Sequence, residues 1–215
     1  MAEFRVSHAR GLLTVLMFGV TLLAGCAASQ LGNMWRDESF KTTGLKSVLV
    51  IAMRVDQVRR RLWEDSFSSG LGAYGTKATP SYKLWANAVP DTQQVIEAVR
   101  RDGYDGVLVN MRPPDTHLDL WVPGYTKRES VTQQNPFTGA YYTYWKDVEV
   151  PGRTETQRVA NFQTDVWTTI EGGRLVWSGR SQTTDGVDVN VIRTQTDKLV
   201  LPELAKSGVL AAKAK

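Results

Sequence analysis

Two short stretches in which every residue is aliphatic constrain the fold more than any other feature of this 215-residue sequence. Residues 48–51 and 107–109 are continuous rather than alternating runs, which is typical of strands buried on both faces. Two segments of helical character, 56–70 and 91–103, lie between them and are separated by a further candidate strand at 77–85. The order β-α-β-α-β predicts a mixed or parallel sheet with helices on its faces.

The second of these helices carries start and stop signals. Asp91 is suited to cap its N-terminus, Gln94 follows three residues later as in a capping box, and Gly103 is suited to end it. The first helix is expected to end in the glycine-rich segment 70–75. That segment has the spacing of a dinucleotide-binding motif, but such a motif precedes its helix and this one follows it, so no cofactor is predicted.

The second half of the chain predicts antiparallel strands and then one helix. Residues 118–126 and 140–150 are expected to pair around a polar loop at 127–139. The C-terminal segment, 187–210, has apolar residues at helical spacing and is expected to pack on the sheet, with Pro202 kinking or restarting the helix.

A further hairpin is predicted around Gly172-Gly173, because paired glycines suit a tight turn between strands. Leu175 and Trp177 are expected to continue, on the return strand, the apolar face of the first strand. That face carries Ala160, Phe162, Val166 and Ile170.

Together these patterns predict the fold class α/β (α+β): a β-α-β-α-β core whose mixed sheet is extended by antiparallel hairpins and covered by a C-terminal helix. A single domain is expected at 46–210, with a polar, non-periodic tether at 26–45 before it and a short tail at 211–215 after it.

The N-terminus has the pattern of a secreted lipoprotein. Two arginines precede an uncharged stretch, 11–25, whose fifteen residues are fewer than the roughly 20 that a membrane span needs. The stretch runs into Leu23-Ala24-Gly25-Cys26, which resembles the lipobox of bacterial lipoproteins. The resemblance implies a signal peptide at 1–25, cleavage between Gly25 and Cys26, and lipidation of Cys26, which would hold the protein to a membrane.

The residue after the cysteine indicates which membrane. Lipoproteins kept in the inner membrane commonly carry Asp at this position, and this chain has Ala27. In a Gram-negative host the resemblance therefore implies an outer-membrane lipoprotein that faces the periplasm.

Composition limits the remaining chemistry. One cysteine and two histidines exclude disulfide frameworks, zinc clusters and most histidine-based catalysis, so no metal site is predicted. A net charge of +4 is too small to indicate a nucleic-acid partner. The run Arg59-Arg60-Arg61 is expected to lie on a solvated helix face, where Arg60 and Arg61 pair at i,i+4 with Glu64 and Asp65.

Two motifs and the order of elements resemble a known group of proteins. The third core strand has the sequence Tyr-Asp-Gly-Val-Leu-Val at 104–109, and the last hairpin ends in Gly-Arg-Leu-Val-Trp-Ser-Gly at 173–179. With the lipobox, these resemble bacterial lipoproteins whose domain is similar to the periplasmic domain of the curli secretion channel subunit CsgG and to the N-terminal domain of TolB. The resemblance covers roughly 46–210 and implies a domain without catalytic residues.

An aromatic group in the strand-rich half is the main candidate for partner binding. Alternation places Tyr142 and Tyr144 on one strand face and Tyr141 and Trp145 on the other, with Trp121 on the expected partner strand. One pair is expected in the core and the other exposed, where it would bind a protein partner or a glycan. Cross-strand packing without a ligand is the alternative.

Two function classes follow. The first is a non-enzymatic accessory or scaffold lipoprotein that binds an envelope protein, or a second copy, through 116–152. The second is a periplasmic ligand- or glycan-binding protein or hydrolase that uses the loop after the third strand, where His117 lies near Arg112 and Asp115 and could act as a general base. Because no nucleophile lies beside His117 in the sequence, the first class is favoured.

Overall fold

The computed structural model describes residues 29–41, 43–54, 56–184 and 186–213. The predicted signal peptide, its cleavage site and Cys26 lie outside these residues. In chain order the elements are β1 (Ser29–Arg36), β2 (Ser47–Ala52), α2 (Gln57–Gly72), β3 (Lys77–Pro80), η1 (Ser81–Lys83), α3 (Thr92–Asp102), β4 (Gly106–Met111), β5 (Thr116–Val122), β6 (Tyr125–Gln134), β7 (Tyr141–Val150), β8 (Arg153–Thr168), η2 (Ile170–Gly172), β9 (Arg174–Thr183), α4 (Val189–Arg193), the π-helix η3 (Thr194–Val200) and α5 (Leu201–Lys206).

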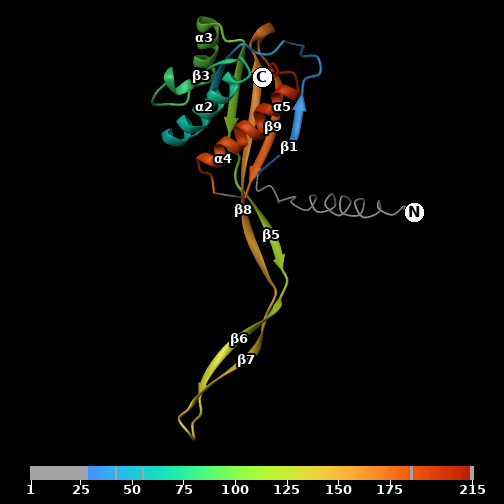
Figure 1. Cartoon of the computed structure of the whole chain (residues 1–215). Helices are drawn as coiled ribbons and strands as arrows, with labels where there is room; N and C mark the ends of the chain where they lie inside the picture. Colours follow the sequence, from blue (N-terminus) through green and yellow to red (C-terminus); the bar gives the residue numbers. More distant parts are fainter. Residues whose placement is uncertain (1–28, 42, 55, 185, 214–215) are drawn as a thin grey trace, which may run out of the picture.

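A mixed sheet forms the centre of the domain, with its strands in the order β1-β9-β8-β4-β2-β3 (Figure 1). β2 runs parallel to both β3 and β4, whereas the pairs β4–β8, β8–β9 and β1–β9 are antiparallel. β5 pairs with β8 outside this path, and β6 and β7 form a separate two-stranded sheet. The predicted α/β (α+β) class with a mixed sheet is confirmed.

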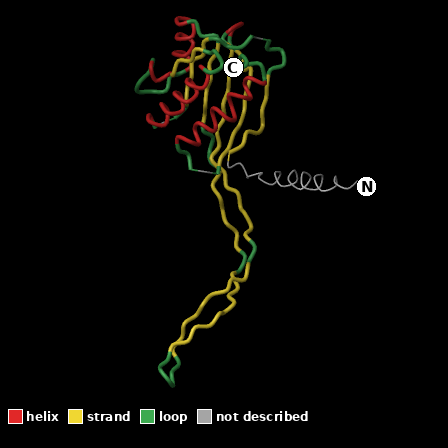
Figure 2. Tube along the Cα trace, in the orientation of Figure 1, coloured by secondary structure: helices red, strands yellow, loops and turns green. Residues whose placement is uncertain are grey.

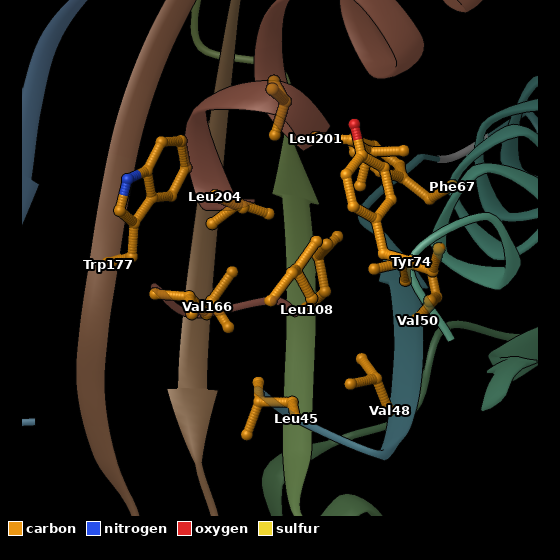
Figure 3. Packing of buried hydrophobic residues seen from close by; sticks show 14 of the residues in the cluster. Leu45, Val48, Val50, Phe67, Tyr74, Leu108, Val166, Trp177, Leu201 and Leu204 are labelled. Atoms are coloured by element: carbon orange, nitrogen blue, oxygen red, sulfur yellow. The ribbon is translucent and has the colours of Figure 1, made fainter. Parts of the chain in front are cut away.

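The main hydrophobic core lies between one face of the sheet and the helices α2 and α5. Trp63 of α2 packs against Phe162 of β8, with ring centroids 4.8 Å apart. Burying one such side chain contributes about 1.5–3 kcal/mol, so this layer holds the domain together. Figure 3 shows others that converge on the same space, namely Val48, Val50, Phe67, Leu108, Val166, Trp177, Leu201 and Leu204.

The opposite face of β2 and β4 packs against α3. Leu49 and Ile51 are buried there beside Val95 and Val99. The predicted capping box of α3 is confirmed, since the Asp91 side chain accepts from the backbone of Gln94 and the Gln94 side chain accepts from the backbone of Asp91. The helix ends at Gly103, whose φ of 68° favours glycine.

The middle residue of the arginine run is buried, so the predicted solvated face is wrong at this position. Arg60 and Glu64 form an ion pair that is closed to solvent. Arg60 also donates to the carbonyl oxygens of Trp85 and Ala88, and Glu64 accepts from the backbone N–H of Tyr82. This face of α2 therefore holds the segment after β3, a contact that sequence periodicity does not indicate.

The strand predicted at 77–85 is shorter than expected. β3 ends at Pro80, and the chain then forms the 3₁₀ turn η1. Glu64 accepts hydrogen bonds from both the Ser81 hydroxyl and the Tyr82 backbone, which turns the chain away from the sheet at this point.

The segment expected to be a tether is part of the domain from Ser29 onward. β1 pairs with β9 and forms an edge of the sheet, and Phe40 and Leu45 are buried in the core. The domain therefore begins before residue 46, because β9 offers its free edge to a strand of this segment.

The predicted glycine hairpin is confirmed, with φ values of 92° at Gly172 and 84° at Gly173. Ala160, Phe162, Val166 and Trp177 lie in the core as expected. Two residues differ from the prediction. Ile170 is 53% exposed because β8 has ended, and an irregularity in the ladder places Leu175 opposite Trp167.

The helical C-terminal segment is confirmed. α4, η3 and α5 follow one another without a break, and Pro202 lies at the start of α5 directly after the π-helix. Because proline lacks a backbone N–H, regular α-helical bonding cannot continue through it, which fits the predicted restart.

Candidate functional site

A long two-stranded arm, formed by residues 116–159, projects from one end of the sheet, where it continues the middle strands β4 and β8 (Figures 1 and 2). Its proximal ladder consists of β5 and the first half of β8, and its distal ladder consists of β6 and β7. The second half of β8 continues between β4 and β9 in the central sheet, so one strand belongs to both arm and domain.

The arm corrects the predicted pairing of this region. Residues 127–134 were expected to be a loop, but they are part of β6, and the connection between β6 and β7 is only 135–140. Trp121 lies opposite Thr154 of β8 and does not pair with the 140–150 strand. The polar sequence of residues 127–134 favours a loop. A strand whose two faces are both exposed to solvent, however, does not require apolar residues on either face.

Two Pro-Gly pairs divide the arm into its two ladders. Pro123-Gly124 follows β5, and Pro151-Gly152 precedes β8 at the same level of the opposite strand. Proline cannot donate a ladder hydrogen bond, so the pairing is interrupted in both strands at once. The Trp121 ring lies against Gly152, where a Cβ atom would come within 2.5 Å of it. We call this point the joint of the arm.

All the aromatic residues predicted to bind a partner are exposed on the arm. Tyr141 and Trp145 are 72% and 67% exposed on one face, and Tyr142 and Tyr144 are 48% and 40% exposed on the other. The expectation that one pair is in the core is therefore wrong, because no described element packs on either face of the distal ladder. The rings of Tyr142 and Tyr144 stack on each other at 5.9 Å, which shows that they share a face.

The outer part of the distal ladder has no charged residue. Across residues 130–145 there is no Asp, Glu, Lys, Arg or His, and the first charges are Glu129 and Lys146, which lie opposite each other. Phe137 is 95% exposed at the apex. Asn135 shapes the turn, since its side chain accepts from the backbone N–H groups of Phe137 and Thr138. We call residues 130–145 the arm tip.

Ion pairs fasten the arm where it leaves the domain. Asp115 accepts hydrogen bonds from Arg112, at 2.8 Å, and from Arg158 of β8. Burial tends to raise the pKa of Asp115, but the hydrogen bonds from the two guanidinium groups outweigh it and hold this pKa below its ordinary value. The carboxylate therefore stays ionised and links the loop after β4 to the returning strand.

Arg54, which lies near the base of the arm, also donates hydrogen bonds to oxygen atoms of the chain. It follows β2, and its guanidinium donates to the backbone and side-chain oxygens of Asn110 at 3.2 and 2.6 Å. Burial, together with the charges of Arg112 and Arg59, lowers the pKa of Arg54 to about 10. The arginines at the carboxyl ends of β2 and β4 thus hold the base of the arm together.

The general-base arrangement considered for His117 is not formed. His117 lies exposed on β5 opposite Arg158, and in the described part of the chain it makes no hydrogen bond to Asp115 or Asp119. Asp119 instead accepts from the Thr156 hydroxyl at 2.7 Å. Among the described residues no group of three or more His, Cys, Asp or Glu side chains is placed to hold a metal ion.

None of the described helices is both long and apolar enough to cross a membrane.

Comparisons with known proteins give remote likenesses. No family model matches the chain, and neither does any curated protein sequence. The PelC dodecamer from Paraburkholderia phytofirmans is 12% identical and has a TM-score of 0.45, with 86% of this chain and 99% of that chain covered. The lipoprotein GNA1162 from Neisseria meningitidis is 11% identical and has a TM-score of 0.37, with 75% and 99% covered. With TM-scores below 0.5, these likenesses do not decide what the chain does.

Proposed function

We propose that this chain is a lipid-anchored accessory or scaffold protein of the bacterial outer membrane, which faces the periplasm and works by binding rather than by catalysis. The observation that carries the proposal is the arm. This 44-residue hairpin is exposed on both faces and both edges, so its side chains and unpaired backbone groups are available to an external partner.

The lipid anchor in this proposal rests on the lipobox resemblance at Gly25 and Cys26, and the outer-membrane location rests on Ala27. The likeness to CsgG and TolB domains, drawn from the motifs at 104–109 and 173–179, supports an envelope role without a catalytic centre.

The proximal ladder is suited to bind a protein partner by strand pairing. β5 pairs only with β8 among the described strands, so its other edge presents unpaired backbone groups. Leu118 and Leu120 are 48% and 41% exposed on one face of this ladder, and Trp121 is 67% exposed on the other. An open edge gives affinity through main-chain hydrogen bonds, and the flanking apolar side chains give specificity.

The experiment is site-specific photo-cross-linking in the native membrane. A photoreactive amino acid at Trp121 is expected to capture one protein in stoichiometric yield, whereas the same probe at Val58, which is 68% exposed on α2, should not. Leu118→Asp should prevent capture from position 121, and Val58→Asp should leave it unchanged. His117→Ala should also leave it unchanged. Equal capture at both probe positions, or loss of the protein's cellular role in a folded His117→Ala variant, would contradict the proposal.

A further inference from the structure

Ser29, the first described residue, and the base of the arm lie at the same end of the strands of the sheet. Ser29 of β1 pairs with Thr183 of β9, and Thr183 pairs on its other side with Ala160 of β8. Val159, which precedes Ala160 in β8, already pairs with Thr116 of β5 in the arm. Two strand spacings, or roughly 10 Å, therefore separate Ser29 from the strand that enters the arm.

This relationship limits where a membrane can lie. Cys26 precedes Ser29 by three residues, which can span at most about 11 Å. With Cys26 lipidated, as in the proposed function, the bilayer surface lies within that reach of the arm base. One strand of the arm, residues 116–135, extends for about 65 Å. An arm of that length starting so close to the membrane can contact the bilayer along its whole length in two ways, by lying on the surface or by crossing the hydrocarbon.

The charges of the arm exclude the second path. Exposed charged residues occur throughout the arm between its base and its tip, including Asp119, Arg128, Asp147, Arg153 and Glu155. In hydrocarbon each would be costly, and so would the unpaired backbone groups along both edges of a two-stranded hairpin.

The arm tip has the composition of the layer between water and hydrocarbon. It carries no charge, and tyrosine and tryptophan, which favour the level of the lipid headgroups, are exposed on both of its faces. Its polar side chains, such as Thr132, Gln133 and Thr143, can keep their hydrogen bonds in that layer. Because both faces carry aromatic rings, contact does not depend on how the ribbon is rotated about its axis.

We propose that the arm tip is a second membrane contact, in which Phe137, Tyr141, Tyr142, Tyr144 and Trp145 enter the headgroup layer of the bilayer that holds the lipid anchor. The anchor and the tip then fix the protein at two separated points, and the arm lies along the membrane surface between them. The proposal takes the anchor from the proposed function and adds a surface distinct from the protein-binding proximal ladder.

The test uses the full chain, purified from membranes in detergent and reconstituted into phosphatidylethanolamine–phosphatidylglycerol vesicles. An environment-sensitive dye is attached to Phe137→Cys at the tip or, as the matched control, to Val58→Cys on the domain; both positions are exposed, so neither change should affect folding. Lipids with a nitroxide near the headgroup are expected to quench the tip dye severalfold more strongly than the control dye. Tyr144→Asp together with Trp145→Asp should remove this difference.

The outcomes separate the two proposals. Vesicle flotation reports on the anchor, and quenching reports on the tip. A protein that floats with the vesicles while its tip dye is quenched no more than the control overturns the tip contact and leaves the anchor standing. A protein that does not float overturns the anchor and, with it, the inference. A tip dye that is shielded from water but insensitive to the lipid nitroxide, or shielded only at high protein density, identifies a second copy of this chain as its partner and also overturns the inference.

Discussion

Arg60 Nε lies 3.0 Å from Glu64 Oε1, and neither side chain is exposed to solvent. The pair is not isolated. Ser81 donates to Glu64 and accepts from Arg60, and the carbonyl oxygens of Trp85 and Ala88 accept from the same guanidinium. Two residues on one turn of α2 thus satisfy the backbone of the segment that connects β3 to α3.

Removing one member of this pair should be costly. Glu64→Ala leaves a buried guanidinium without its carboxylate and is expected to lower the free energy of unfolding by about 3–5 kcal/mol. Chemical denaturation monitored by tryptophan fluorescence measures the change. Glu97→Ala, at an exposed position of α3, should stay within about 0.5 kcal/mol of the parent. A similar decrease in the free energy of unfolding in both variants would contradict a specific stabilising role of the buried pair.

The glycine turn gives a second prediction. Gly172 and Gly173 both have positive φ, which β-branched residues resist, so replacing both by Val should destabilise the domain by at least about 1 kcal/mol. Gly72→Ala is the matched control, since its φ is not positive and a Cβ atom there meets nothing within 4 Å. An unchanged melting temperature in the double variant would contradict the observed turn.

The base of the arm should weaken in acid. Because the pKa of Asp115 is lower in the folded chain than in the unfolded one, its contribution is present above the unfolded value, near 4, and is lost as the pH falls through the folded value. Arg158 is largely exposed, so the contribution at pH 7 is expected to be at most about 1 kcal/mol. Stability curves of the parent and Asp115→Asn should therefore differ at pH 7 and converge below the folded pKa; parallel curves at all pH values would exclude this role.

Replacing aromatic residues of the arm should have little effect on the stability of the domain. Tyr142→Ala with Tyr144→Ala is expected to change the free energy of unfolding of the domain by no more than about 1 kcal/mol, because both side chains pack against each other and not against the core. Trp63→Ala, by contrast, should cost about 3–5 kcal/mol. Circular dichroism during thermal unfolding tests both, and a large loss in the tyrosine variant would show that the arm supports the domain.

The anchor prediction concerns Cys26. Cys26→Ser removes the thiol that accepts the lipid, so the protein should no longer incorporate labelled palmitate and should leave the outer-membrane fraction. Incorporation that persists in the variant would place the lipid elsewhere or exclude the lipobox.

The domain was predictable where local chemistry and burial agree. The aliphatic runs at 48–51 and 107–109, the capping box of Asp91 and Gln94, and the glycine turn each specify their element within a few residues of sequence, and each is confirmed. Long-range partners were not predictable in this way. The pairing of β1 with β9 joins residues about 150 positions apart, and nothing in the polar sequence of β1 indicates it.

The arm shows a different limit. Alternation correctly assigned Tyr141 and Trp145 to one face and Tyr142 and Tyr144 to the other, but it implies a buried side only when another layer exists to cover it. A ribbon of two strands has no such layer. The sequence features that indicate the arm are the two Pro-Gly pairs at 123–124 and 151–152. They lie at the same level of opposite strands, as expected for a long hairpin with a joint.

The path of β8 has a mechanical consequence. This single strand leaves the arm and then lies between β4 and β9, with an unbroken row of hydrogen bonds on the β4 side from Gln163 to Thr168. Because β4 also leads into the arm through β5, a pull on the far end of the arm draws β4 and β8 in the same direction. The load then falls in shear on the two ladders that join this pair of strands to β2 and to β9. The arm is thus attached to the two middle strands of the sheet, and tension on its far end reaches the core of the domain through the ladders on both sides of them.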